Sequence, residues 1–204
     1  METNILIVGV GGQGVITVGR LISMAGILAS HNVVMSELHG LAQRGGSVSV
    51  NVRVGNVLSP IPEANSVDCV IAIEPMEGLR YSARVGKQAV FIVNLHPMTP
   101  ISLSMEDKEY PPIPAILDEI RKDHQVIPID ATSIAHRVGN IRVSNSVLAG
   151  AMAAAEIVNI SRNDFIIAIT KMFGSKVKDQ NIQAFDSGYS YTMEYLEKNH
   201  ILLD

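Results

Sequence analysis

Four glycines stand near the start of the chain, three of them with the spacing G-x-G-x-x-G: Gly9, Gly11, Gly14 and the additional Gly12. Glycine lets the backbone turn sharply and leaves the first N–H groups of a following helix uncovered, where an anion can dock. The spacing therefore predicts a phosphate or cofactor site at residues 11–14, with Gln13 among its residues. Because a lone G-x-G-x-x-G is a weak signal, a tight turn that serves only strand–helix packing is an equal alternative.

A second run combines polar and ionisable side chains with two adjacent glycines. Its candidate binding residues are Ser36, Glu37, His39, Gln43, Arg44, Gly45 and Gly46. Glu37 and Arg44 could form an ion pair, and His39 and Gln43 would share one face of a helical turn. Adjacent glycines in a polar turn indicate a backbone that approaches a ligand or partner, although a solvated loop is the competing interpretation. With no further His or Cys nearby, no metal site is predicted.

The elements that must position these motifs alternate along the chain. Buried apolar stretches predict strands near residues 4–9, 32–37, 47–54, 67–73, 89–95 and 125–130, with helical spacing between most of them. From residue 144 onward the pattern is helical. We therefore expect a single domain over residues 1–204, with an α/β part over about 1–143 and a helical part over about 144–204. The fold class is α/β, a three-layer α/β/α domain with a mostly parallel, mixed sheet.

The stretch at 47–54 departs from a plain parallel sheet. Only eight residues, 39–46, connect it to the preceding strand that carries Glu37, fewer than the roughly 10–12 that a parallel crossover needs. We expect this strand to be antiparallel or near an edge, and its alternation predicts one wet or interfacial face. Pro128 places the strand at 125–130 on an edge. If the first two strands are parallel neighbours, their carboxyl ends bring both motifs to one edge of the sheet, where sites collect.

Composition excludes several classes of function. The net charge of −4 and an aromatic content of 4% without Trp argue against a nucleic-acid partner. No apolar run reaches the ~18 residues of a membrane span, and nothing resembles a signal peptide, so we expect no membrane association and a cytoplasmic location. Apolar residues make up 47% and charged ones only 18%, which predicts a subunit interface and a hetero-oligomer.

Taken together, the glycine turn and the run at 36–46 resemble the gamma-type domain of the 2-oxoacid:ferredoxin oxidoreductases. The likeness covers the whole chain, including the helix that begins near Asn145 and the stretch at 178–188. The branch of the family that acts on indolepyruvate is the most similar. The resemblance implies oxidative decarboxylation of a 2-oxoacid, expected to be indolepyruvate or another arylpyruvate, to acyl-CoA and carbon dioxide, with ferredoxin accepting the electrons.

The family carries out this reaction with thiamine diphosphate, Mg and 4Fe-4S clusters, and with coenzyme A as cosubstrate. The single cysteine, Cys69, cannot hold a cluster that needs four, and no thiamine diphosphate motif is present. The cofactors are therefore expected on the large (alpha) subunit, with none bound by this chain alone. We expect this chain to assist assembly or to close over coenzyme A, to supply no catalytic residue, and to be inactive by itself. Arg44 is the residue best suited to hold an anion there.

Two alternatives remain open. A self-contained Rossmann-like nucleotide-binding oxidoreductase would use the glycine turn and would place Glu37 on the ribose, but the missing crossover helix argues against it. A pure interaction subunit would contact no ligand at all. The choice of 2-oxoacid is expected to lie on the partner.

Overall fold

The computed structural model describes residues 2–39, 46–98, 109–201 and 203. The strands are β1 (Thr3–Val10), β2 (Val33–His39), β3 (Ser47–Val54), β4 (Cys69–Ala72), β5 (Val90–Asn94) and β6 (Gln125–Ile129). They form one six-stranded sheet in the order β2-β3-β1-β4-β5-β6. All six predicted strands are confirmed, with ends that differ by at most two residues.

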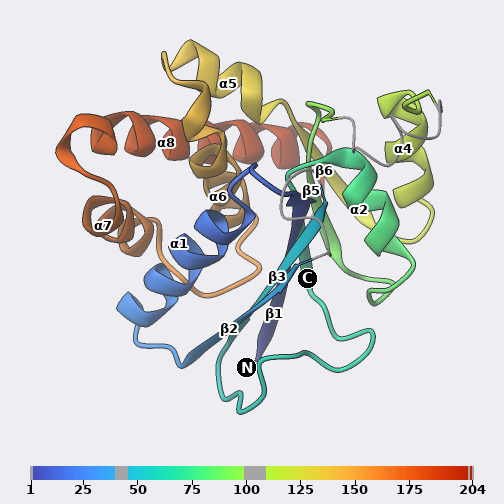
Figure 1. Cartoon of the computed structure of the whole chain (residues 1–204), viewed down its shortest axis with the longest axis horizontal. Coiled ribbons are helices and arrows are strands. Elements are labelled where there is room, and N and C mark those ends of the chain that lie inside the picture. Colours follow the sequence, from blue (N-terminus) through green and yellow to red (C-terminus); the bar gives the residue numbers. More distant parts are fainter. Residues whose placement is uncertain (1, 40–45, 99–108, 202, 204) are drawn as a thin grey trace.

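Helices cover both faces of this sheet, as Figure 1 shows. The helices are α1 (Val15–Leu28), α2 (Pro75–Ser82), α4 (Ile113–Ile120), α5 (Ala131–Arg137), α6 (Ser144–Ala154), α7 (Arg162–Met172) and α8 (Ser175–Lys198), with a short 3-10 turn at Ile141–Val143. α1, α6, α7 and α8 lie on one side of the sheet, and α2 and α4 lie on the other. The predicted three-layer α/β/α fold class is confirmed. None of the described helices is long and apolar enough to cross a membrane.

The alternation of β1 builds a separate core on each face. Ile5 and Ile7 join the cluster under α1, α6 and α8, while Leu6 and Val8 join the cluster under α2 and α4. Because β1 is buried along its whole length, it needs apolar side chains on both faces. The carboxyl end of β1 therefore places the glycine turn at a fixed position at the edge of the sheet.

The strand order corrects one expectation. β1 and β2 are not neighbours, because β3 lies between them and is antiparallel to both. β3 returns from β2 through a connection too short for a crossover helix, which is why it runs antiparallel. β1 and β2 still point the same way, so their carboxyl ends lie on the same edge of the sheet. The mixed-sheet prediction is confirmed.

The polar face of β3 is neither wet nor free, contrary to expectation. Ser49, Asn51 and Arg53 are all buried. The segment that follows β3 covers this face, since Arg53 Nη1 donates to the Ser59 carbonyl at 2.8 Å and Ser36 Oγ donates to the Pro60 carbonyl at 3.0 Å. The chain's own loop thus provides hydrogen-bond partners on this face, which the alternation had predicted to contact solvent or a partner.

β6 lies at the edge of the sheet, as Pro128 predicts. α8 covers that edge: Tyr191 donates to the Pro128 carbonyl at 3.0 Å, and Tyr195 donates to the Val126 carbonyl at 3.4 Å. The helical C-terminal third is therefore held against the sheet by hydrogen bonds as well as by apolar packing.

Candidate functional site

The glycine turn joins β1 to α1 with two residues in the left-handed region. Gly12 has a φ of 101° and Gly14 a φ of 82°, a conformation that other residues rarely adopt. Gln13 closes the turn from within, because its Oε1 accepts from the Val10 N–H at 2.7 Å. The side chain of this predicted binding residue is therefore largely engaged in holding the turn.

A cavity of about 330 Å³ opens at this turn. It is lined by Gly11, Gly12, Gly14, Val15, Ile16, Thr17 and Val48. Gly14 is the N-cap of α1, no side chain caps this helix end, and its first turn has no acidic residue. Among the described residues, the N–H groups of Gly12, Gly14, Val15 and Ile16 have no hydrogen-bond partner. Uncovered donors at a helix N-terminus favour an anionic ligand.

The second motif meets the glycine turn at one point. The Gly11 N–H donates to the Gly46 carbonyl at 2.8 Å, which confirms a shared edge for the described ends of both motifs. Gln43, Arg44 and Gly45 lie outside the described residues. His39 is the last residue of β2, so it belongs to a strand and not to the helical turn that the sequence suggested.

Ser36 and Glu37 do not reach the turn. Ser36 pairs with Asn51 across the sheet, four residues along β3 from Ser47 at the turn, a distance of roughly 13 Å. The Glu37 carboxylate lies 3.9 Å from Arg20 on the outer face of α1. β3 separates Glu37 from β1, whereas a dinucleotide fold places the acidic residue on the strand next to the glycine turn.

Sequence reasoning missed the role of Asn145 at this site. Its Nδ2 donates to the Gln13 carbonyl at 3.0 Å and lies 3.4 Å from the Gly14 carbonyl. A Cβ on Gly14 would stand 2.3 Å from that same nitrogen. The first turn of α6 therefore fixes the glycine turn from 131 residues away in sequence. The only signal for this was the family likeness around Asn145.

A pair of buried carboxylates lies beside the same edge and was also missed. Glu74 and Glu77, at the start of α2, are almost completely buried. Glu74 accepts from Tyr110 at 2.5 Å and from the Glu77 N–H at 2.9 Å. Burial raises the pKa of Glu74, against which the Tyr110 hydrogen bond acts. The pKa of Tyr110 is also raised, first by burial and then by the same bond.

We expect Tyr110→Phe to lower the free energy of unfolding by about 1.5–3 kcal/mol at a pH where Glu74 is ionised, the range for a hydrogen bond to a charged group. The folded pKa of Glu74 lies above its ordinary value of 4.5, so its ionisation costs stability as pH rises through that pKa. The Tyr110 hydrogen bond lowers this pKa, so its loss raises the pKa further and makes the ionisation of Glu74 more costly. The stability deficit of the variant should therefore be larger at pH 8 than at pH 5. Chemical denaturation at both values measures it.

Tyr195→Phe is the matched control, because its hydroxyl donates to a neutral carbonyl. It should cost about 1 kcal/mol or less, equally at both pH values. Equal losses in the two variants would contradict a charged partner for Tyr110.

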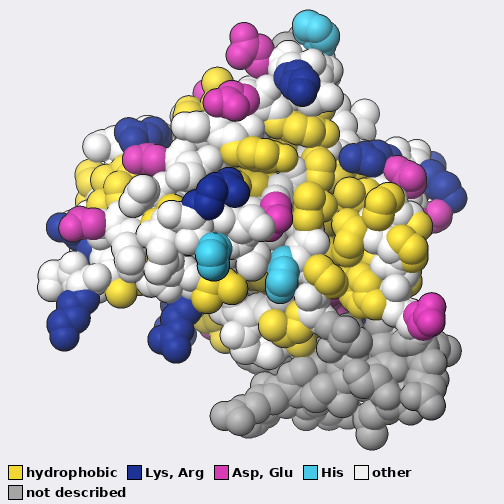
Figure 2. Space-filling model, turned by 90° about the horizontal axis from the view of Figure 1, so that it is seen from above, with side chains coloured by type: hydrophobic (Ala, Val, Ile, Leu, Met, Phe, Trp, Pro, Cys, Tyr) yellow, Lys and Arg dark blue, Asp and Glu magenta, His cyan; other side chains and the backbone are white. Residues whose placement is uncertain are grey.

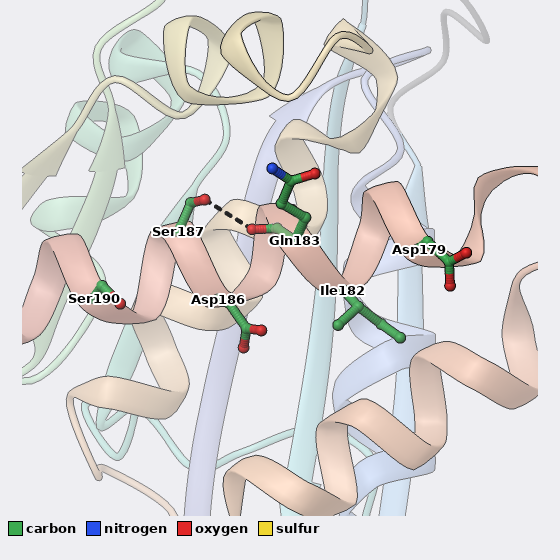
Figure 3. Close-up of a pocket in the computed structure, with 6 residues that line it drawn as sticks. All are labelled: Asp179, Ile182, Gln183, Asp186, Ser187 and Ser190. Atoms are coloured by element: carbon green, nitrogen blue, oxygen red, sulfur yellow. Dashed lines mark hydrogen bonds between the residues drawn. The ribbon is translucent and has the colours of Figure 1, made fainter.

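Another cavity, of about 390 Å³, lies along α8 (Figure 3). Its lining residues are Asp179, Ile182, Gln183, Asp186, Ser187 and Ser190. All of them come from one helix, and Asp186 is already paired with Arg162 at 2.6 Å. Because functional sites gather groups from several elements, this groove is a weaker candidate than the glycine turn.

Most of the chain is similar to known proteins. The model of the pyruvate ferredoxin/flavodoxin oxidoreductase family matches residues 4–191. The chain belongs to this family. A relative from Archaeoglobus fulgidus, the indolepyruvate oxidoreductase subunit IorB, is 38% identical over 191 residues, 93% of this chain and 95% of the relative. The protein of the same name from Methanothermobacter thermautotrophicus is 34% identical, over 95% of this chain and 100% of the relative.

Solved structures of family members share the fold. The gamma subunit of a keto/oxoacid ferredoxin oxidoreductase from Geobacter sulfurreducens superposes with a TM-score of 0.69 at 22% identity, over 94% of this chain and 99% of that one. A 2-oxoglutarate:ferredoxin oxidoreductase from Magnetococcus marinus, solved with 2-oxoglutarate, coenzyme A and succinyl-CoA, gives 0.75 at 20% identity. This chain is fully covered there and spans 32% of that larger chain.

The single cysteine of the sequence does not fit the iron–sulfur clusters that this family implies. Cys69 is completely buried in β4, and burial strongly raises its thiol pKa, whereas a cluster is held by several thiolates. In the described ranges, no three His, Cys, Asp or Glu side chains gather as a metal site would require.

Proposed function

We propose that this chain is the small subunit of an indolepyruvate:ferredoxin oxidoreductase and that its glycine-turn cavity receives part of coenzyme A. Membership of the family supports a subunit of a 2-oxoacid:ferredoxin oxidoreductase. The relatives named for indolepyruvate, which match along nearly their whole length, support the choice of substrate.

The cavity at the glycine turn is the observation that carries the assignment of a ligand. Coenzyme A is an anion with a pyrophosphate, and the unpartnered N–H groups at the start of α1 are donors for such a group. Arg44, which stands in the sequence between the end of β2 and Gly46, would add a fixed positive charge and two parallel hydrogen-bond donors. The likeness in fold to a protein solved with coenzyme A is compatible with this proposal.

Thiamine diphosphate, magnesium and the iron–sulfur clusters are assigned in this proposal to the large subunit, and ferredoxin accepts the electrons there. This chain then contributes binding and closure rather than a catalytic group. Figure 2, which views the molecule from the side of α5, shows hydrophobic side chains gathered over the side of the sheet that carries α2 and α4. An exposed apolar surface of that kind suits contact with a large partner.

Purification of the chain with its large subunit tests the proposal. We expect the complex to reduce ferredoxin with indolepyruvate and coenzyme A and to form the corresponding acyl-CoA, detected by mass spectrometry. Each subunit alone should be inactive. In the complex, coenzyme A should slow amide hydrogen exchange in the peptide that covers residues 11–17.

Two results would contradict it separately. Full activity of the large subunit alone would remove this chain from the reaction. Activity of the complex without any protection at residues 11–17 would favour the interaction subunit that contacts no ligand.

A further inference from the structure

The buried hydrogen bond between β3 and α2 has no role in the proposal above. Ser47 Oγ donates to Glu77 Oε2 at 2.6 Å. The other oxygen of Glu77 lies 3.4 Å from Arg80 Nε. The Glu77 side chain is only 2% exposed. Both of its carboxylate oxygens thus have partners, and the group is a built connection between the sheet and a helix rather than an open ligand site.

Ser47 occupies the position next to the contact between the two motifs. Gly46 accepts from the Gly11 N–H, and Ser47 itself pairs with Val10, the last residue of β1. The following residue, Val48, lines the glycine-turn cavity. A tether on Ser47 therefore fixes the backbone on both sides of it, at Gly46 and at the cavity wall.

Further hydrogen bonds connect Glu77 to the rest of the α2 N-terminus. The Glu77 N–H donates to Glu74, and Glu74 accepts from Tyr110. Tyr110 lies three residues before the start of α4 at Ile113, so the two glutamates join the start of β3 to the chain that leads into α4. Hydrogen bonds to a buried carboxylate are strong and directional, which suits them to hold a backbone in one place.

We propose that Ser47 and Glu77 are positioning residues for the glycine-turn cavity: their hydrogen bond holds Gly46 against Gly11 and Val48 against Gly9. Neither residue contacts the ligand. The proposal rests on the proposed function only for the identity of that ligand, because the positioning of the turn is a property of this chain.

Ser47→Ala in the complex of both subunits tests this role. Losing one hydrogen bond to a charged group can change an equilibrium by about tenfold, so we expect the KM for coenzyme A to rise by about three- to tenfold with kcat within twofold of the parent. Amide exchange in the peptide covering residues 10–14 should become faster. Ser47→Thr keeps the hydroxyl and suits a strand, so it should restore both values.

Ser82→Ala is the control variant. It removes a hydroxyl that donates to Leu79 within α2, and it should leave both measurements unchanged. If Ser47→Ala leaves amide exchange at residues 10–14 and the KM unchanged, the positioning role is wrong. If exchange becomes faster while the KM stays constant, the positioning role stands and the coenzyme A assignment is wrong.

Discussion

Replacing Gly188 by alanine is expected to lower the free energy of unfolding by about 3 kcal/mol, the upper end for overpacking of a core. A Cβ at this position would stand 2.0 Å from the Val147 carbonyl oxygen of α6. Gly150 of α6 meets α8 in the same way, 2.0 Å from the Phe185 carbonyl oxygen. Because backbone atoms cannot rotate away as a side chain can, the two helices must separate to accept either methyl group.

Chemical denaturation of Gly188→Ala, Gly150→Ala and the double variant measures this effect. The double variant should lose less than the sum of the single losses, since one substitution already separates the helices. Gly174→Ala, at the N-cap of α8 with open space around it, is the control and should cost less than about 1 kcal/mol. A loss below 0.5 kcal/mol in Gly188→Ala, on the scale of about ±0.5 for neutral surface changes, would refute the close helix contact.

Gly14→Ala should impair the use of coenzyme A more than any other single change at the turn. Alanine at a φ of 82° is strained, and its Cβ would stand 2.3 Å from Asn145 Nδ2, so the turn or the Asn145 amide must shift and the hydrogen bonds that hold the turn are disturbed. We expect the KM for coenzyme A in the complex to rise by more than about tenfold, because a shift of the N–H donors removes more than one hydrogen bond.

Variants of two further glycines distinguish the effect of backbone strain from that of the clash with Asn145. Gly12→Ala introduces strain at the turn with nothing within 4 Å of its Cβ, and it should raise the KM less than Gly14→Ala. Gly139→Ala introduces similar strain after α5, away from the cavity, and should leave the KM unchanged. Equal effects of Gly12→Ala and Gly14→Ala would show that Asn145 does not determine the position of the turn.

Local sequence patterns predicted the strands well because each pattern depends only on the burial and hydrogen bonding of its own residues. The continuous apolar run from Ile5 to Val8 requires burial on both faces, and Pro128 cannot donate within a sheet interior. The eight-residue connection before Ser47 likewise restricts strand direction through chain length alone. Each of these inferences needs only a short window of sequence.

The parts of the site that escaped prediction depend on contacts between distant segments. Glu74 and Glu77 have the sequence of an ordinary exposed helix start, and their burial depends on segments that are distant in sequence, among them Tyr110 and Ser47, which donate hydrogen bonds to them. Asn145 reaches the glycine turn from another helix. Ser36 and Glu37 were placed too near the turn because a strand that comes later in the chain separates β2 from β1.

The insertion of β3 also determines when the N-terminal half can assemble during synthesis. Within the described sheet, β2 pairs only with β3. A nascent chain that ends before Ser47 therefore holds β1, α1 and β2 without a single strand ladder among them. When Ser47–Val54 emerges, it forms antiparallel ladders with both β1 and β2. It also supplies the strand residues against which α1 packs. Until then the apolar faces of β1 and α1 lack their cover, which is the condition under which nascent chains need chaperones.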